Sequence, residues 1–271
     1  MPEADAGGVF QRPDAGFNDL PGWTWVGTYG GYYLQSDLLS GFEHGFFTRC
    51  WHGREPQELA GDLSAGVSVH RPRQVHGAVV LPASDAAAAP WPEADGLCSD
   101  AGGQSLWVCG ADCTPVLIAD PRQGRVAACH AGWRGVAARI VPVAMARMEA
   151  LGSRRADLLV ALGPAISGPM YQVERPVSEA VAAALEPPGQ LDPQAGLALL
   201  AEAGALLPDP RPGCDRLDIR AATLAQLERF GIPREHQAVC PLCTFGLSSL
   251  FHSWRRDRVR AVQWSGIVSQ S

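Results

Sequence analysis

Residues 106–131 read LWVCGADCTPVLIADPRQGRVAACHA, and they contain the clearest strand pattern in the chain. Three short apolar runs, Leu106–Cys109, Pro115–Ala119 and Val126–Cys129, lie within this segment, and Leu158–Leu162 is a fourth run of the same kind. Each run has the length of a strand and is bounded by Gly, Asp or Pro. These four segments therefore predict the strands of a central sheet.

Other segments carry weaker strand, turn and helix signals. Trp23–Tyr33 is aromatic and β-branched with interrupting glycines, which predicts strands joined by tight turns, and Asp95-Gly96 is a turn signal. Three segments are predicted to be helical: Gly135–Leu151 with a kink at Pro142, Pro176–Leu185 with proline in its first turn, and Ile219–Phe230 with Asp218 as its cap and Gly231 as its stop.

Strands and helices follow one another without strict alternation, which favours the α+β class over a doubly wound parallel sheet. We expect a single domain with mixed β-sheets and surrounding helices. Residues 1–22 are rich in Gly, Pro and Asp without periodicity and are predicted to form a flexible N-terminal arm. Residues 23–271 are predicted to form the catalytic domain.

Composition excludes several classes of protein. Hydrophobic residues make up 46% of the 271 and charged residues 18%, so a sizeable core can form. All 22 basic residues are Arg, which excludes a Schiff-base or Walker A lysine. The net charge of −6 argues against a nucleic-acid partner. The uncharged stretch Leu158–Val173 is broken by Gly and Pro, so no membrane span is predicted there. We expect a soluble, cytoplasmic protein.

The chain has 8 Cys and no recognisable export signal, so reduced thiols are the expectation, with metal binding or catalysis open to some of them. Cys240-Pro-Leu-Cys243 is a CxxC pair. A structural zinc site would need a second such pair at short spacing. We therefore interpret Cys240 and Cys243 as a pair of buried, apolar thiols.

Reactive residues gather in Arg73–Gly77, Ala111–Pro115 and Cys129–Gly135. His76, Cys113 and His130 each lie at the end of a predicted strand or beside a turn, where functional sites are often built. Two imidazoles and a thiolate are a common ligand set for catalytic zinc, with a fourth position open for water or substrate. The same residues would also serve a Cys–His nucleophilic pair, with Cys113 as the thiolate and either histidine as the base. Spacing alone leaves both hypotheses open, along with a structural role.

Several arginines are candidate anion ligands. Arg134 lies where the glycine-rich segment Gly132–Gly135 opens a predicted helix, so it could hold a phosphate bidentately, or lie on the surface beside a simple turn. Arg49 is a further candidate. Phe251–Asp257 mixes aromatic and guanidinium groups that could stack a base and hold phosphate or ribose, although a strand with a solvated ion-pair face is the alternative.

Eight motifs occur in an order that resembles the laccase-domain family, formerly called multicopper polyphenol oxidase-like and now described as purine nucleoside phosphorylases. They are HGFFTR (44–49), QVHG (74–77), ADGL (94–97), ADCTPVLIAD (111–120), HAGWRG (130–135), LGPAI (162–166), CTF (243–245) and FHSWRRD (251–257). The resemblance covers about residues 42–268, and so many ordered motifs make a chance match improbable.

The resemblance implies a single α+β domain and a zinc ion held by His76, Cys113 and His130. The implied activity is phosphorolysis of adenosine, inosine, guanosine and methylthioadenosine to the base and ribose 1-phosphate, with adenosine deamination beside it. Polyphenol oxidation with copper is an older attribution, which fits poorly with a single three-ligand site. Some relatives are described as peptidoglycan editing factors that remove L-serine from a UDP-MurNAc precursor, an amide hydrolysis that zinc-activated water would also serve.

On this basis we assign catalysis to Cys113, His76, His130 and Arg134, and we assign substrate binding to Arg49, Gln74, Trp133 and Arg255. A non-catalytic, metal-stabilised binding module is the alternative from another class. We expect small-molecule substrates, purine nucleosides and phosphate, and a monomer or small homo-oligomer.

The chain departs from the family pattern at two places. The segment after HGFFTR reads Cys50–Glu55 in place of a GGVS-like loop, and the usual YEV is Tyr171-Gln172-Val173. Both departures leave the predicted metal ligands in place, and both bear on substrate preference.

Overall fold

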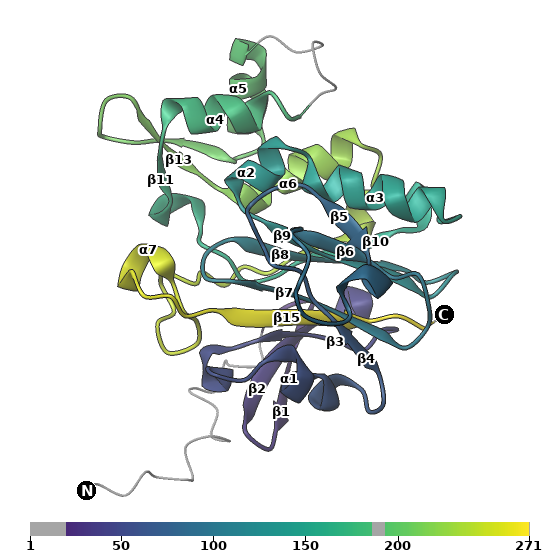
Figure 1. Ribbon diagram of the computed structural model, residues 1–271. Helices are drawn as coiled ribbons and strands as arrows, with labels where there is room; N and C mark the ends of the chain where they lie inside the picture. The colour runs from purple at the N-terminus through teal and green to yellow at the C-terminus, as the bar shows by residue number, and fades with distance from the viewer. Residues whose placement is uncertain (1–19, 186–192, 271) are drawn as a thin grey trace, which may run out of the picture.

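The computed structural model describes residues 20–185 and 193–270, which form three β-sheets and seven α-helices (Figure 1). Most of the predicted N-terminal arm, residues 1–19, lies outside the described residues, as do residues 186–192 and Ser271. Helices and strands of the described part build one domain of the α+β class, as the sequence predicts.

The strands form two sheets of six and one sheet of three. The first sheet, in spatial order, comprises β1 (Trp23–Thr28), β2 (Gly31–Ser36), β3 (His44–Phe47), β15 (Gln263–Val268), β7 (Gln104–Gly110) and β4 (Ser68–His70). The second comprises β14 (Gln237–Val239), β10 (Leu159–Leu162), β8 (Thr114–Asp120), β9 (Arg125–Ala131), β6 (Gly96–Cys98) and β5 (Val80–Pro82). The third comprises β11 (Gln172–Glu174), β13 (Cys214–Leu217) and β12 (Leu206–Pro208).

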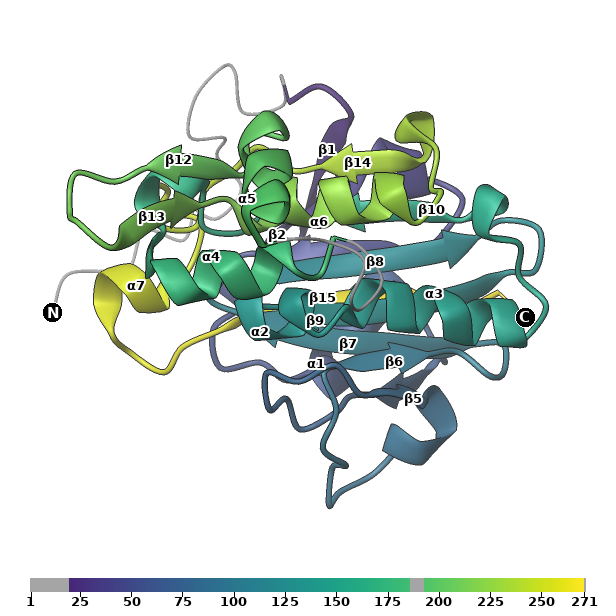
Figure 2. The same ribbon diagram turned by 90° about the horizontal axis from the view of Figure 1, so that it is seen from above.

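The helices lie mainly on the outer face of the second sheet, where α2, α3 and α6 cover its strands (Figure 2). The helices of the described residues are α1 (Pro56–Leu63), α2 (Trp133–Ala137), α3 (Ile140–Ala150), α4 (Arg175–Ala182), α5 (Pro193–Glu202), α6 (Ile219–Arg229) and α7 (Trp254–Asp257). None of them is long and apolar enough to span a bilayer.

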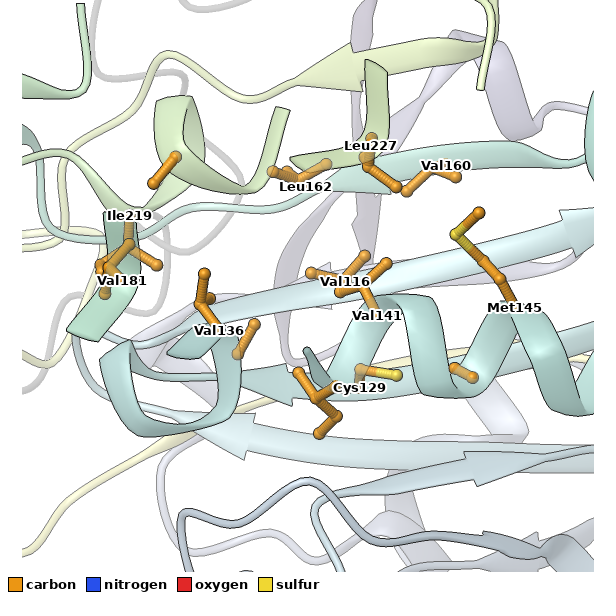
Figure 3. Close-up of a cluster of buried hydrophobic side chains, with 14 of the residues drawn as sticks. Val116, Cys129, Val136, Val141, Met145, Val160, Leu162, Val181, Ile219 and Leu227 are labelled. Carbon is orange, nitrogen blue, oxygen red and sulfur yellow. The ribbon is translucent and has the colours of Figure 1, made fainter. Parts of the chain in front are cut away.

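The second sheet is buried on both faces, which explains its unbroken apolar runs. Along β8, Val116 and Ile118 pack under the helices, whereas Leu117 and Ala119 point into the core between the two large sheets. Figure 3 shows the first of these cores, with Val116 facing Val141 of α3. A strand with one solvated face would have alternated with polar residues.

A third core lies on the outer face of the first sheet, where α1 packs. Its largest side chains are aromatic, and its members include Phe47, Trp107, Trp264 and Leu59. The order of layers is therefore α1, first sheet, second sheet and outer helices. The four predicted central strands correspond to β7, β8, β9 and β10.

The strand predictions are confirmed, and two of the helix predictions need only their ends adjusted. Trp23–Tyr33 forms the antiparallel hairpin of β1 and β2. The predicted Ile219–Phe230 helix is α6, where the Asp218 side chain accepts hydrogen bonds from the Arg220 and Ala221 amides. The predicted Pro176–Leu185 helix is α4, which begins one residue earlier and ends at Ala182.

The predicted single helix Gly135–Leu151 is wrong, because the segment forms two helices, α2 and α3. The interruption is at Arg139, which adopts a left-handed conformation with φ of 59°. Pro142 does not cause it: this residue lies in the first turn of α3, where a missing amide donor removes no helical hydrogen bond. The strand alternative for residues 251–257 is also wrong, because the Ser253 side chain caps α7 there.

The Asp218 cap supports a test of the fold. Asp218→Ala removes the acceptor for two α6 amides and for the Gly168 amide, whose hydrogen bond to Asp218 Oδ2 is 3.0 Å long. We expect the free energy of unfolding to fall by about 1–2 kcal/mol, measured by urea denaturation. Asp85→Ala, at an exposed position, is the control and should change it little. Equal stability of the two variants would contradict a capping role for Asp218.

Candidate metal centre

His76, Cys113 and His130 come together in the structure, with their ligand atoms all within 4.8 Å of one another. The two imidazole rings lie edge to face, with centroids 4.8 Å apart and an interplanar angle of 83°. His130 is 4% exposed, whereas His76 is on the surface and Cys113 is partly covered. The group is therefore anchored in the core on one side and open to solvent on the other.

The β8–β9 hairpin brings two of the three residues together. Thr114 pairs with Ala131 and Pro115 pairs with His130, so the start of β8 and the end of β9 meet at one edge of the sheet. Cys113 immediately precedes Thr114, in the turn that links β7 of the first sheet to β8 of the second. A shift of the register by one residue would turn His130 to the opposite face.

The turn that carries Cys113 is held by its neighbour Asp112, which has a φ of 100°. The Asp112 carboxylate accepts hydrogen bonds from Thr244 Oγ1 at 2.7 Å and from the Arg255 amide at 2.7 Å. Its carbonyl accepts from the Ile166 amide at 3.0 Å. A non-glycine residue rarely adopts this conformation, and these three bonds from distant segments compensate for its strain.

Asp95 fixes the third residue, His76, and the orientation of His130. Its fully buried carboxylate accepts the amide hydrogens of Val75, His76 and Gly77 at 3.2, 2.9 and 2.6 Å. It also accepts a hydrogen bond from His130 Nδ1 at 2.9 Å. With Nδ1 as the donor, His130 presents Nε2 as its ligand atom.

The predicted turn at Asp95-Gly96 is therefore wrong: Gly96 begins β6, and Asp95 is a buried hydrogen-bond acceptor. The sequence reasoning gave Asp95 no role, although its motif, ADGL, belongs to the family resemblance. Burial opposes ionisation of Asp95, but its hydrogen bonds from His130 and Gly77 dominate and lower the pKa of the carboxyl. The carboxylate is thus charged and can orient the imidazole.

Charges within the group favour a thiolate. Burial alone would raise the pKa of Cys113, but hydrogen bonds and charge from His130 and His76 outweigh it and lower that pKa. Conversely, burial alone would lower the pKa of His130, but hydrogen bonds and charge from Asp95 and Cys113 outweigh this effect and raise that pKa. By contrast, burial raises the pKa of Cys109 to about 12. These charges therefore favour an anionic Cys113 sulfur, the form in which a cysteine can bind a metal.

The donor set fits a zinc ion. It consists of two imidazole nitrogens and one thiolate, a composition found in catalytic zinc sites that keep a position for water or substrate. In the described part of the chain, no other His, Cys, Asp or Glu residues form a group of three that could hold a metal. The carboxylate behind His130 is the usual partner of a zinc-bound histidine.

Aromatic and guanidinium groups lie beside this centre. The Arg134 guanidinium lies 4.4 Å from the Trp133 ring centroid, and that of Arg255 lies 4.8 Å from the ring centroid of Tyr171. Burial raises the pKa of Tyr171 to about 12, and the charges of Cys113, Arg255 and Arg134 also act on it. The structure therefore brings both predicted anion ligands, Arg134 and Arg255, to the surroundings of Cys113, together with Tyr171, which the sequence reasoning did not assign.

The remaining predicted substrate residues have other contacts. The Gln74 side chain donates from Nε2 to the Cys109 backbone carbonyl at 2.8 Å and accepts at Oε1 from the Cys109 backbone amide at 2.8 Å. These two hydrogen bonds hold the loop that contains Gln74 against β7. Arg49 lies in a second cluster, where its guanidinium donates to the Ser248 carbonyl. Substrate binding by these two residues stays a prediction.

The CxxC pair is not the apolar pair that we expected. Cys240 is fully buried, but Cys243 is half-buried, and its sulfur accepts hydrogen bonds from the Ser167 amide at 3.3 Å and from Ser167 Oγ at 3.1 Å. These bonds offset burial and lower the pKa of Cys243. The sequence reasoning missed this environment because Ser167 is distant in sequence.

A cavity of about 550 Å³ lies elsewhere in the molecule, lined by the end of β2, the residues that follow it and the C-terminal end of β15. None of the predicted site residues lines it. We place the functional site at the metal centre, because the reactive groups and their perturbed pKa values are found there.

The chain is similar to known proteins over most of its length. Residues 54–269 match the family model described as multi-copper polyphenol oxidoreductase laccase. "Purine nucleoside phosphorylase slr1573" from Synechocystis is 43% identical over 257 residues, covering 91% of this chain and 97% of that protein.

Solved structures resemble the fold over almost its whole length. The Bacillus licheniformis hypothetical protein YfiH has a TM-score of 0.76 at 25% identity, covering 91% of this chain and 99% of its own. YlmD from Geobacillus stearothermophilus has a TM-score of 0.74 at 25% identity, covering 97% and 99%.

The close approach of Gly132 to the sulfur ligand gives a first test of the centre. A Cβ at position 132 would lie 2.9 Å from Cys113 Sγ, so Gly132→Ala should displace the sulfur without removing a ligand. We expect zinc affinity to fall about 10- to 100-fold, the range for changes around a metal ligand. Competition with a chelator measures this. Gly61→Ala, where a Cβ meets nothing within 4 Å, is the matched control, and equal affinities would refute the steric argument.

The charge state of Cys113 gives a second test. In metal-free protein, the rate of Cys113 alkylation by iodoacetamide should rise with pH at a midpoint below 9.0, the usual value for this thiol. The lowered pKa supplies thiolate at neutral pH, whereas Cys109 should stay unreactive there. Peptide mass spectrometry resolves the two sites. Added zinc should protect Cys113, and an ordinary alkylation midpoint would contradict the thiolate assignment.

Proposed function

The chain belongs to the laccase-like family described as multi-copper polyphenol oxidoreductase laccase, and from this membership and the site geometry we propose that it is a zinc-dependent purine nucleoside phosphorylase. Relatives named purine nucleoside phosphorylase support a phosphorylase-like enzyme acting on small molecules. The proposed substrates are adenosine, inosine, guanosine and methylthioadenosine, with adenosine deamination as a side activity. We also propose that the protein is cytoplasmic and that it is a monomer or a small homo-oligomer.

The observation that carries the proposal is the half-open group of His76, Cys113 and His130, backed by Asp95. Three protein ligands leave a coordination position for a substrate or water, whereas a purely structural zinc site uses four. A bound zinc ion supplies Lewis acidity, which polarises a substrate oxygen or activates water. This arrangement favours catalysis over a non-catalytic binding module.

In phosphorolysis, a phosphate oxygen forms a bond to C1′ of the ribose, and the glycosidic bond to the purine nitrogen breaks. The base leaves with its bonding electrons and takes up a proton, and ribose 1-phosphate is the other product. We assign phosphate binding to Arg134, whose charge, like that of Cys113, acts on Tyr171 and whose guanidinium can form two parallel hydrogen bonds. Trp133 and Arg255 offer flat surfaces against which a purine base can stack.

Amide hydrolysis of a cell-wall precursor is the second candidate for the same centre, because a half-open zinc site can activate water for either reaction. The requirement for phosphate separates the two. A phosphorylase needs phosphate as its nucleophile, whereas deaminases and amidohydrolases use water.

The decisive assay mixes purified protein with adenosine, with and without phosphate. Adenine and ribose 1-phosphate should form only with phosphate, and inosine should form in both cases. Cys113→Ala should lose zinc and both activities, because the thiolate is a ligand, whereas Cys109→Ala should keep them. Chromatography of the products and elemental analysis give the readouts. Full zinc occupancy in Cys113→Ala would overturn the assignment of Cys113 as a ligand. If the wild-type protein consumed no adenosine, the proposed phosphorylase activity would be overturned.

Arg134→Lys separates phosphate binding from the metal. Lysine keeps the charge but loses the bidentate fork, and each charge-assisted hydrogen bond contributes about 1.5–3 kcal/mol. Phosphorolysis should therefore fall roughly tenfold or more, whereas deamination should fall much less and zinc content should stay the same. Steady-state rates of both reactions on one preparation measure this, with Arg260→Lys as an exposed control. Equal losses in both reactions would mean that Arg134 does not hold phosphate.

A further inference from the structure

Two segments that are far apart in sequence meet beside the 3₁₀ turn Arg49–Trp51. The Arg49 amide donates to the Leu250 carbonyl at 2.8 Å, and its guanidinium donates to the Ser248 carbonyl. The rings of His52 and His252 lie against each other, with centroids 4.8 Å apart at 62°. We call Arg49, His52 and His252 the Arg–His cluster.

His252 is the buried member of the Arg–His cluster. It is 7% exposed, and its Nε2 atom has no hydrogen-bond partner within the described ranges 20–185 and 193–270. A buried polar atom without a partner is costly, because it has lost its hydrogen bonds to water, and the large majority of buried side-chain polar atoms in proteins have a partner. The cost is removed when a ligand supplies the missing hydrogen-bond partner.

The charges around His252 determine what kind of ligand fits. Burial lowers the pKa of His252 to about 4, and the positive charges of Arg49, His52 and Arg256 act in the same direction. Asp257 opposes them, but its carboxylate is held by the Arg256 guanidinium at 2.8 and 2.7 Å. No carboxylate of the described residues lies within ion-pair distance of Arg49. The local field therefore repels a cation and attracts an anion.

A second metal site is a poor explanation of the histidine pair. A metal would need a third ligand, and the described residues contain no such group apart from His76, Cys113 and His130. An oxyanion needs what the cluster has, namely a guanidinium with parallel donors and imidazole N–H groups.

One member of the Arg–His cluster, His52, departs from the family pattern, whereas Arg49 and His252 lie in the HGFFTR and FHSWRRD motifs. His52 lies in Cys50–Glu55, the segment that replaces the GGVS-like loop that follows the FTR motif in relatives. A glycine-rich loop offers no imidazole, so a site that uses His52 is not implied by the family resemblance.

We propose that Arg49, His52 and His252 form a binding site for a tetrahedral oxyanion of the phosphate class, separate from the phosphate position assigned to Arg134. In this site the anion accepts hydrogen bonds from Arg49 and from Nε2 of His252, and His52 closes it on the solvent side. The proposal does not depend on the phosphorylase activity, because it requires only binding.

The test follows the imidazole signals of full-length protein labelled with ¹⁵N-histidine, at constant pH. The His252 signals are identified by their loss in His252→Gln. Potassium phosphate should shift them saturably, whereas potassium chloride at the same ionic strength should not. In Arg49→Gln the midpoint should move to roughly tenfold or more higher phosphate, because a charge-assisted hydrogen bond is lost. Methyl phosphate in place of phosphate shows whether phosphomonoesters bind as well as the free anion.

Three further variants make the result specific. His52 is exposed, so His52→Asn should not disturb folding, and it should also raise the phosphate midpoint. This variant tests the site if Arg49→Gln fails to fold. Arg260→Gln removes an exposed charge from the C-terminal segment and should leave the midpoint unchanged. Arg134→Gln should also leave it unchanged, so that failure of the phosphorylase proposal is distinguishable from failure of this one. Absence of a shift, an equal shift with chloride, or an unchanged midpoint in both Arg49→Gln and His52→Asn would overturn the site.

Discussion

Both the stability of this protein and the geometry of its candidate metal centre depend on the antiparallel pairing of β8 with β9. The hairpin is buried on both faces, so its side chains alternate between the helix-covered core and the core between the sheets. The same register sets Cys113 and His130 at one edge of the sheet. Because slipping by one residue would exchange the two cores, the packing that stabilises the fold also fixes the separation of the two ligands.

Asp95 extends this constraint to a third segment. Its carboxylate accepts three amides from the His76 loop and the imidazole proton of His130, so one buried charge positions two ligands. A charge at such a site is tolerated only when its lone pairs are well satisfied. The carboxylate therefore serves folding and ligand orientation at once, and removing it would leave several buried donors without a partner.

The sequence predicts the central strands well, because two-sided burial leaves a clear apolar signal such as Val116–Ala119. It predicts the ligand triple through residue chemistry and the family resemblance. Local signals failed where long-range contacts decide the structure. Asp95-Gly96 has turn composition, yet four donors bind Asp95 and Gly96 pairs with Cys129 in the sheet. Similarly, nothing in the pattern around Pro142 indicates that the chain turns at Arg139.

The family description mentions several coppers, but the donors of this chain favour a single ion. Multicopper chemistry needs several metal centres rich in histidine. The described residues provide one group of three, and only two of its members are histidines. The thiolate could bind copper as well as zinc, but a half-open site backed by a carboxylate suits Lewis-acid chemistry without a change of oxidation state. His252 does not enlarge the centre, because the positive charges of Arg49 and Arg256 act on it. The arrangement of charges thus separates a cation site from an anion site within one domain.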